Sequence, residues 1–78
     1  MPRHNARQFA SRIARLGFVR IGHGRHEKWH NPRTNRMVVI SRHGSKTFGP
    51  GMMSKMLRDA GLTVEQYLAD ELDDEEGS

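Results

Sequence analysis

The spacing of apolar residues changes twice along the chain, and these changes constrain the fold more than any other feature. Phe9, Ile13 and Leu16 recur every three or four residues, which is typical of one face of an α-helix. Residues 18–41 instead contain short runs that alternate or are rich in β-branched residues, with turn-forming residues between them. A helical spacing returns in residues 50–60. The pattern therefore predicts a helix, three short strands and a second helix.

We expect an α+β fold of order α-β-β-β-α, in which the predicted strands cover residues 18–22, 25–30 and 36–41. Because the strands follow one another closely, they should form a three-stranded antiparallel sheet. Helices packed on one face of such a sheet leave the other face open to solvent. Thr63 with Gln66 forms a capping-box pattern, which predicts a short additional helix near the C-terminal end.

The chain has 78 residues, which is enough for a single domain. We assign residues 1–72 to this domain and residues 73–78 to a disordered acidic tail. Mean hydropathy is −0.79, so a small core is expected, and a partner protein or a homodimer could supply further burial. The absence of cysteine excludes disulfides and thiolate metal ligands. Without any stretch of ~20 apolar residues, we expect a cytoplasmic protein that does not enter a membrane.

Positive and negative charges are strongly separated along the sequence. Residues 1–58 contain 13 Lys and Arg and one acid, giving +12, whereas residues 59–78 contain eight acids and no base, giving −8. A body with this much positive charge suits a polyanionic partner such as RNA or DNA. The alternative is a solvated cationic surface without a specific partner. The acidic end could also fold back over the body as an internal mimic of phosphate.

Strand periodicity divides the side chains of residues 25–30 between the two faces of the predicted sheet. Trp29 is the only tryptophan and the largest apolar group of this strand, so we expect its face to join the core. The residues on that face are Arg25, Glu27 and Trp29. The residues on the opposite, open face are His26, Lys28 and His30.

The first predicted strand is assigned in the same way. Val19 and Ile21 are apolar and are expected to join Trp29 in the core. Arg20 lies between them and is therefore expected on the open face with His26. An imidazole surrounded by cations would then stand on an exposed sheet.

Three interpretations of the histidines compete. The spacing of His23, His26 and His30 resembles a metal-ligand run, but strand alternation separates His23 and no cysteine completes a site, so we predict no metal. Exposed or structural histidines without a chemical role are the second interpretation. The third is acid–base catalysis on RNA, in which an imidazole takes the ribose 2′-hydroxyl proton or protonates the leaving 5′-oxygen. This chemistry requires no cofactor, and the sequence offers no carboxylate pair, Ser-His-Asp set or P-loop for another common reaction.

Several short motifs, in their order and spacing, resemble the HicA family of bacterial toxins. The resemblance extends from about Ala6 to Leu68. The motifs are Leu16-Gly17-Phe18, Gly24-Arg25-His26 followed by Trp29, Arg42-His43-Gly44, Pro50-Gly51 with Leu57, and Ala60-Gly61-Leu62. It implies a fold like that of double-stranded-RNA-binding domains, ribosome-independent cleavage of mRNA, and neutralisation by a HicB-type antitoxin.

The resemblance also implies roles for individual residues. His26 occupies the place of the family's catalytic histidine, and Arg25 stands where the family usually has a small hydroxyl residue. The segment from Arg42 to Lys46 matches the family's basic loop, which implies a role in substrate binding. We therefore expect His26 to act as general acid or base. The residues expected to bind RNA are Arg20, Arg25, Lys28, His30, Arg42, His43 and Lys46.

We therefore predict a toxin-type endoribonuclease, an mRNA interferase that cleaves single-stranded RNA without a metal ion and so inhibits translation and growth. Two other classes of function stay open. One is a non-catalytic RNA- or DNA-binding module of the same fold, which Arg25 favours. The other is a growth inhibitor that acts through a protein partner, for which the acidic C-terminal segment is the only support.

Overall fold

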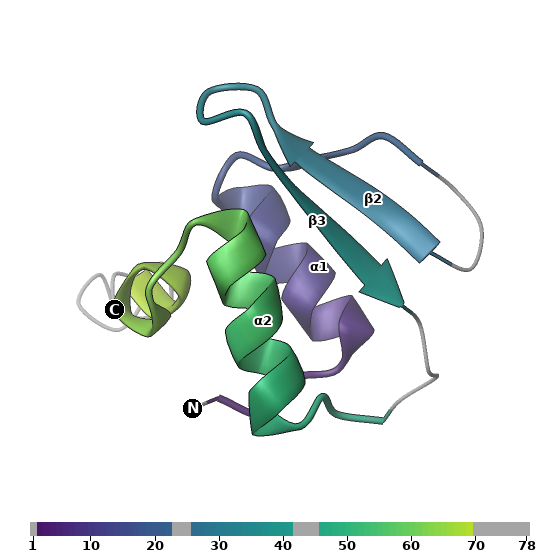
Figure 1. Ribbon diagram of the computed structural model, residues 1–78, viewed down its shortest axis with the longest axis vertical. Coiled ribbons are helices and arrows are strands. Elements are labelled where there is room, and N and C mark those ends of the chain that lie inside the picture. The colour runs from purple at the N-terminus through teal and green to yellow at the C-terminus, as the bar shows by residue number, and fades with distance from the viewer. Residues whose placement is uncertain (1, 23–25, 42–45, 70–78) are drawn as a thin grey trace, which may run out of the picture.

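A computed structural model describes residues 2–22, 26–41 and 46–69, and within them the chain forms an antiparallel sheet with helices on one face (Figure 1). The elements are α1 (Ala6–Arg15), β1 (Val19–Arg20), β2 (His26–Asn31), β3 (Arg36–Ser41) and α2 (Pro50–Ala60), followed by a short helix over residues 64–69. The predicted α+β class and the α-β-β-β-α order are confirmed. No helix in this part of the chain combines the length and apolarity needed to cross a membrane.

Helix α1 begins at a capping box. The Asn5 side chain accepts a hydrogen bond from the backbone N–H of Gln8 at 2.9 Å, and the Gln8 side chain accepts one from the backbone N–H of Asn5 at 2.8 Å. Just after the helix, Gly17 has a φ of 101°, a left-handed conformation that strains residues with a Cβ atom. This glycine turns the chain from α1 into β1.

Helix α2 begins with a proline and ends with a glycine. Pro50 occupies its first turn, where the missing N–H has no helical partner, and Gly61 ends it with a φ of 71°. The next helix starts at the predicted capping box, where Thr63 and Gln66 exchange hydrogen bonds of 2.9 and 3.0 Å between side chain and backbone. The short link between the two helices is therefore fixed at both ends.

The sheet has the order β1-β2-β3. Strands β2 and β3 pair over six positions, from His26 opposite Ser41 to Asn31 opposite Arg36. Strand β1 contributes only two paired positions, although the Ile21 N–H also donates to the Lys28 carbonyl at 2.8 Å. The β2–β3 pair therefore forms most of the sheet, and β1 is a short edge.

The core lies between the sheet and the helices. Helix α2 contributes the buried residues Met53 and Met56 to this core, whereas Met52 is 45% exposed. The largest buried side chains are those of Tyr67, Phe9, Ile13, Ile40, Met53, Glu27 and Val38. Tyr67 belongs to the short C-terminal helix and is stacked on Phe9 with ring centroids 5.3 Å apart. That helix is therefore part of the packed body.

The faces of β1 are the reverse of those predicted. Val19 lies opposite His30 and Arg20 opposite Trp29, and residues directly opposite each other share a face of the sheet. Phe18 takes the inward position and is 3% exposed, so strand alternation turns Val19 outward and Arg20 inward. The expectation that Val19 and Ile21 join the core was wrong, because they are 54% and 56% exposed.

Candidate active site

The open face of the sheet carries His26 at the beginning of β2. His26 is exposed and lies opposite Ser41, the last residue of β3. Lys28 and His30 follow on the same face, where strand alternation predicted them, and Lys28 is exposed while His30 is half-buried. Three nitrogen-bearing side chains therefore stand in a row along one strand, on the side of the sheet that the helices leave uncovered.

Apolar side chains surround this row. Val39 lies opposite Lys28, and Met37 lies opposite His30. Together with Val19 and Ile21 they are between 46% and 56% exposed. The open face, formed by these residues and by His26, Lys28 and His30, is therefore a mixed surface of cations and exposed apolar groups. This property was not expected from the sequence, because Val19 and Ile21 were predicted to lie in the core.

The two histidines of β2 differ in their surroundings. One ring nitrogen of His30 (Nε2) lies 2.9 Å from Oδ1 of Asn35, in the turn between β2 and β3. This hydrogen bond gives His30 a structural role at the turn. Within residues 2–22, 26–41 and 46–69, the His26 ring makes no hydrogen bond, and its side chain is exposed.

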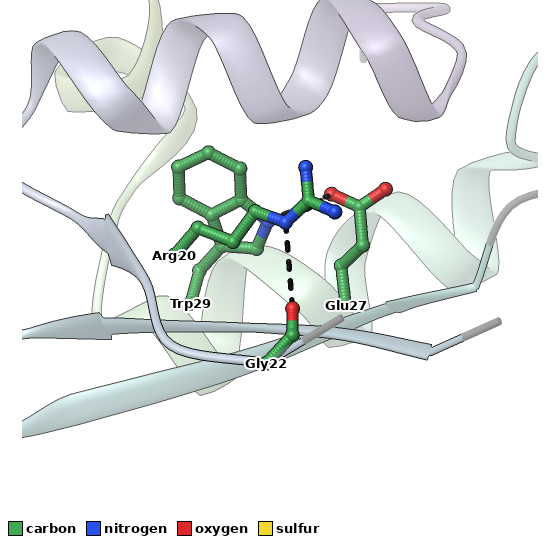
Figure 2. Close-up of polar contacts among 4 residues, drawn as sticks. All are labelled: Arg20, Gly22, Glu27 and Trp29. Atoms are coloured by element: carbon green, nitrogen blue, oxygen red, sulfur yellow. Dashed lines mark hydrogen bonds and ion pairs between the residues drawn. The ribbon is translucent and has the colours of Figure 1, made fainter. Parts of the chain in front are cut away.

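A buried carboxylate, that of the residue after His26, lies on the side of β2 that faces α1 (Figure 2). Glu27 is 1% exposed, and its Oε1 accepts a hydrogen bond of 3.2 Å from the indole N–H of Trp29. Arg20 Nε is 3.9 Å from the same oxygen and 3.4 Å from the carbonyl oxygen of Gly22. These contacts connect β1 to β2 at the residue that follows the candidate catalytic residue.

The position of Arg20 corrects one predicted site residue. Arg20 was expected on the open face among the RNA-binding residues, but its side chain faces the opposite side and lies beside Glu27. The physical reason is the buried carboxylate, since a charge removed from water is stabilised by an opposite charge nearby. Arg20 is therefore not part of the open face.

Four of the residues considered above, His23, Arg25, Arg42 and His43, lie outside the described residues. Their places in the chain are still informative, because residue 25 directly precedes His26 and residue 42 directly follows Ser41, its partner across the sheet. Lys46 is exposed and precedes Thr47, which pairs with Asn5 at the start of α1. This pairing ties the chain near Lys46 to α1 and not to the sheet.

In the part of the chain that the structure describes, no three His, Asp or Glu side chains come together in a way that could hold a metal ion. On the open face, the described residues place an imidazole and a lysine two positions apart on the same strand.

Comparison with known proteins gave one family. The sequence model described as HicA toxin of bacterial toxin–antitoxin systems matches residues 6–62, which run from the start of α1 through the whole sheet to just beyond α2. This match covers more than half of the chain. A comparison with individual curated proteins gave no match.

Proposed function

The chain belongs to the HicA family of toxins from bacterial toxin–antitoxin systems, and from this premise we propose that it is an endoribonuclease with His26 as its acid–base residue. The observation that carries the proposal is the position of His26, exposed at the beginning of β2 on the uncovered face of the sheet. An RNA chain can reach this ring without any movement of the helices.

The reaction follows from the chemistry of RNA. An imidazole removes the proton of a ribose 2′-hydroxyl, and the resulting oxygen attacks the adjacent phosphorus. The bond to the 5′-oxygen breaks, that oxygen receives a proton, and a 2′,3′-cyclic phosphate and a 5′-hydroxyl end are formed. His26 serves as the base or as the acid of this sequence. No metal ion takes part in this scheme.

Two features of the open face suit a single-stranded substrate. Lys28 follows His26 by two residues on the same face, so its ammonium group can stabilise negative charge on the phosphate in the transition state. The exposed apolar side chains of Val39 and Met37 lie next to this row and offer contact surface to unpaired bases. Arg25 and Arg42 are sequence neighbours of the paired residues His26 and Ser41, and we include them in the proposed RNA-binding set.

The test compares wild type with His26→Ala on a defined single-stranded RNA in EDTA. Because general acid–base catalysis contributes about 10²–10⁴-fold to rate, His26→Ala should lower cleavage by at least the smaller factor. Its free energy of unfolding should stay within about 0.5 kcal/mol of the wild-type value, as is usual for substitutions at exposed positions. The wild-type products should carry 2′,3′-cyclic phosphates, and a 2′-deoxy substitution at the cleaved position should stop the reaction.

His30→Ala is the matched control on the same strand. The ring of His30 is hydrogen-bonded to Asn35. Its loss should therefore act mainly on the free energy of unfolding and less on the rate of cleavage. Cleavage that persists in His26→Ala would reject the proposed role. Tight binding without cleavage by the wild type would instead support the second candidate, a non-catalytic nucleic-acid-binding module, which the arginine at position 25 favours.

We further propose that the partner is a HicB-type antitoxin that covers the open face. A partner with acidic and apolar side chains would match the cations and the exposed apolar groups of this surface. Amide hydrogen exchange of β3 should slow when such an antitoxin is bound. Protection confined to α1 or α2 would place the antitoxin elsewhere.

A further inference from the structure

A second basic surface lies on the outer side of α1, on the opposite side of the molecule from the open face. It is a groove of about 430 Å³, and none of its lining residues is acidic. Its lining consists of His4, Arg7, Gln8, Ser11, Arg12 and Arg15. We call this the α1 groove. Because α1 packs on the covered face of the sheet, the groove cannot contact an RNA at His26 without the strand wrapping around the molecule.

The described chain ends beside this groove. Tyr67, in the yellow-green helix of Figure 1, is fully buried, and its hydroxyl lies 2.7 Å from Nδ1 of His4. The guanidinium carbon of Arg12 lies 5.7 Å from the centre of the Tyr67 ring. Two residues that line the α1 groove therefore contact the last helix, and residue 70 is only three positions beyond Tyr67.

The sequence that follows has the opposite charge to the groove. Residues 70–78 contain six acids and no base, whereas three arginines line the groove. Nine residues can span up to about 30 Å when extended, and the ten-residue helix α1 is about 15 Å long. The segment is therefore long enough to follow the whole groove from its point of attachment.

We propose that residues 70–78 dock in the α1 groove and act as an internal polyanion. The attachment next to the groove gives this segment a high effective concentration there, which favours it over a free nucleic acid. Arg7 stands in the first turn of α1, which holds no acidic residue, so an anion at this end also offsets the positive end of the helix dipole. The docked segment neutralises the arginines of α1 and prevents them from binding phosphate.

The first experiment uses full-length protein at low salt and compares amide NMR shifts of α1. In a tail-neutral variant, each acid of residues 70–76 is replaced by its amide, Asp→Asn or Glu→Gln. In a groove-neutral variant, the exposed residues Arg7 and Arg15 are changed, as Arg7→Gln and Arg15→Gln. Tail neutralisation should shift the amides of residues 7–15 in the wild-type background and leave them unchanged in the groove-neutral background.

The control pair is Arg33→Gln with Arg58→Gln, two exposed arginines outside the groove. In that background, tail neutralisation should shift α1 as it does in wild type. Identical α1 shifts in wild type and the tail-neutral variant would overturn the proposal. Shifts that appear at His26 and Lys28 instead would also overturn it, because they would place the tail on the open face.

A binding measurement provides the second test, with a ten-nucleotide oligo-dT as the polyanionic probe. The tail-neutral variant should bind it at least about ten-fold more tightly than wild type at low salt, and the gain should disappear in the groove-neutral background. A gain that survives Arg7→Gln and Arg15→Gln would show that the tail shields another surface. Because DNA has no 2′-hydroxyl, neither experiment depends on cleavage by His26, and the failure of one proposal leaves the other intact.

Discussion

The buried carboxylate of Glu27 provides the sharpest test of how the sheet is held together at the residue after His26. The variant is Glu27→Gln, which keeps the size of the side chain and one oxygen that can accept from the Trp29 indole. It removes the negative charge that lies 3.9 Å from Arg20 Nε. The change therefore isolates the electrostatic part of the contact shown in Figure 2.

The expected cost follows from the exposure of the two partners. Removing one partner of a buried ion pair typically costs about 3–5 kcal/mol, because the other charge stays buried and uncompensated. The side chain of Arg20 is 39% exposed and can turn toward water, which reduces the penalty. We expect Glu27→Gln to lower the free energy of unfolding by about 1–2 kcal/mol. For a domain of this size that corresponds to a loss of roughly 4–16 °C in Tm.

The assay is urea denaturation followed by circular dichroism and by the fluorescence of Trp29. Arg20→Gln and the double variant complete a double-mutant cycle, and the double variant should cost about 0.5–1 kcal/mol less than the sum of the two single changes. Glu65→Gln, at an exposed glutamate, is the control and should be neutral. If Glu27→Gln is as stable as wild type, or if the two changes simply add, the carboxylate does not hold β1 to β2.

Four further changes test other parts of the structure. Asn5→Ala removes the capping box of α1 and should cost about 1 kcal/mol, with most of it restored by Asn5→Ser; equal melting temperatures would contradict this. Gly61→Ala places a Cβ at a φ of 71° and should lower the free energy of unfolding by about 1 kcal/mol. An unchanged free energy of unfolding would mean that the backbone at the end of α2 adjusts without strain. Tyr67→Phe keeps the ring stacking but loses the hydroxyl contact to His4, and it should lower the free energy of unfolding, measured by urea denaturation, by about 1 kcal/mol. An unaltered denaturation midpoint would mean that Tyr67 stabilises the fold by stacking alone. Lys28→Gln should weaken RNA binding equally for all sequences and reduce the slope of log K against log salt by about 0.7, whereas Lys55→Gln on α2 should not; equal slopes would remove this lysine from the RNA-binding surface.

The order of elements and the faces of β2 could be predicted from the sequence because each depends on local patterns. The helix caps are encoded by adjacent residues, and a single large aromatic residue, Trp29, decides which face of β2 is covered. Its neighbours two residues away then share its face by strand geometry alone. The placement of His26 on the open face therefore required no knowledge of distant contacts.

The faces of β1 could not be predicted in the same way. Phe18, Val19 and Ile21 are all apolar, and local alternation does not say which of them enters the core. The choice depends on pairing with β2 and on the burial of Glu27, whose carboxylate draws Arg20 inward. Glutamates are rarely buried, so a sequence pattern gives no reason to expect one there.

The α1 groove shows a further limit of local reasoning. The three arginines of α1 are visible in the sequence, and their place on the outer side of the helix follows from the helical period. Their proximity to the C-terminal end depends on the packing of Tyr67 on Phe9, two residues 58 positions apart in the chain. Contacts over such distances arise from the assembled core, and no local pattern encodes them.

Trp29 is the only tryptophan of the chain and is therefore an intrinsic fluorescent probe of strand β2. Trp29 lies on the side of β2 that faces α1, so a ligand seated on His26 and Lys28 cannot quench it by direct contact. Its emission instead responds to the carboxylate and guanidinium beside it. A spectral change upon ligand addition therefore reports a displacement of the strand itself, and an unchanged spectrum reports binding to a surface that stays rigid.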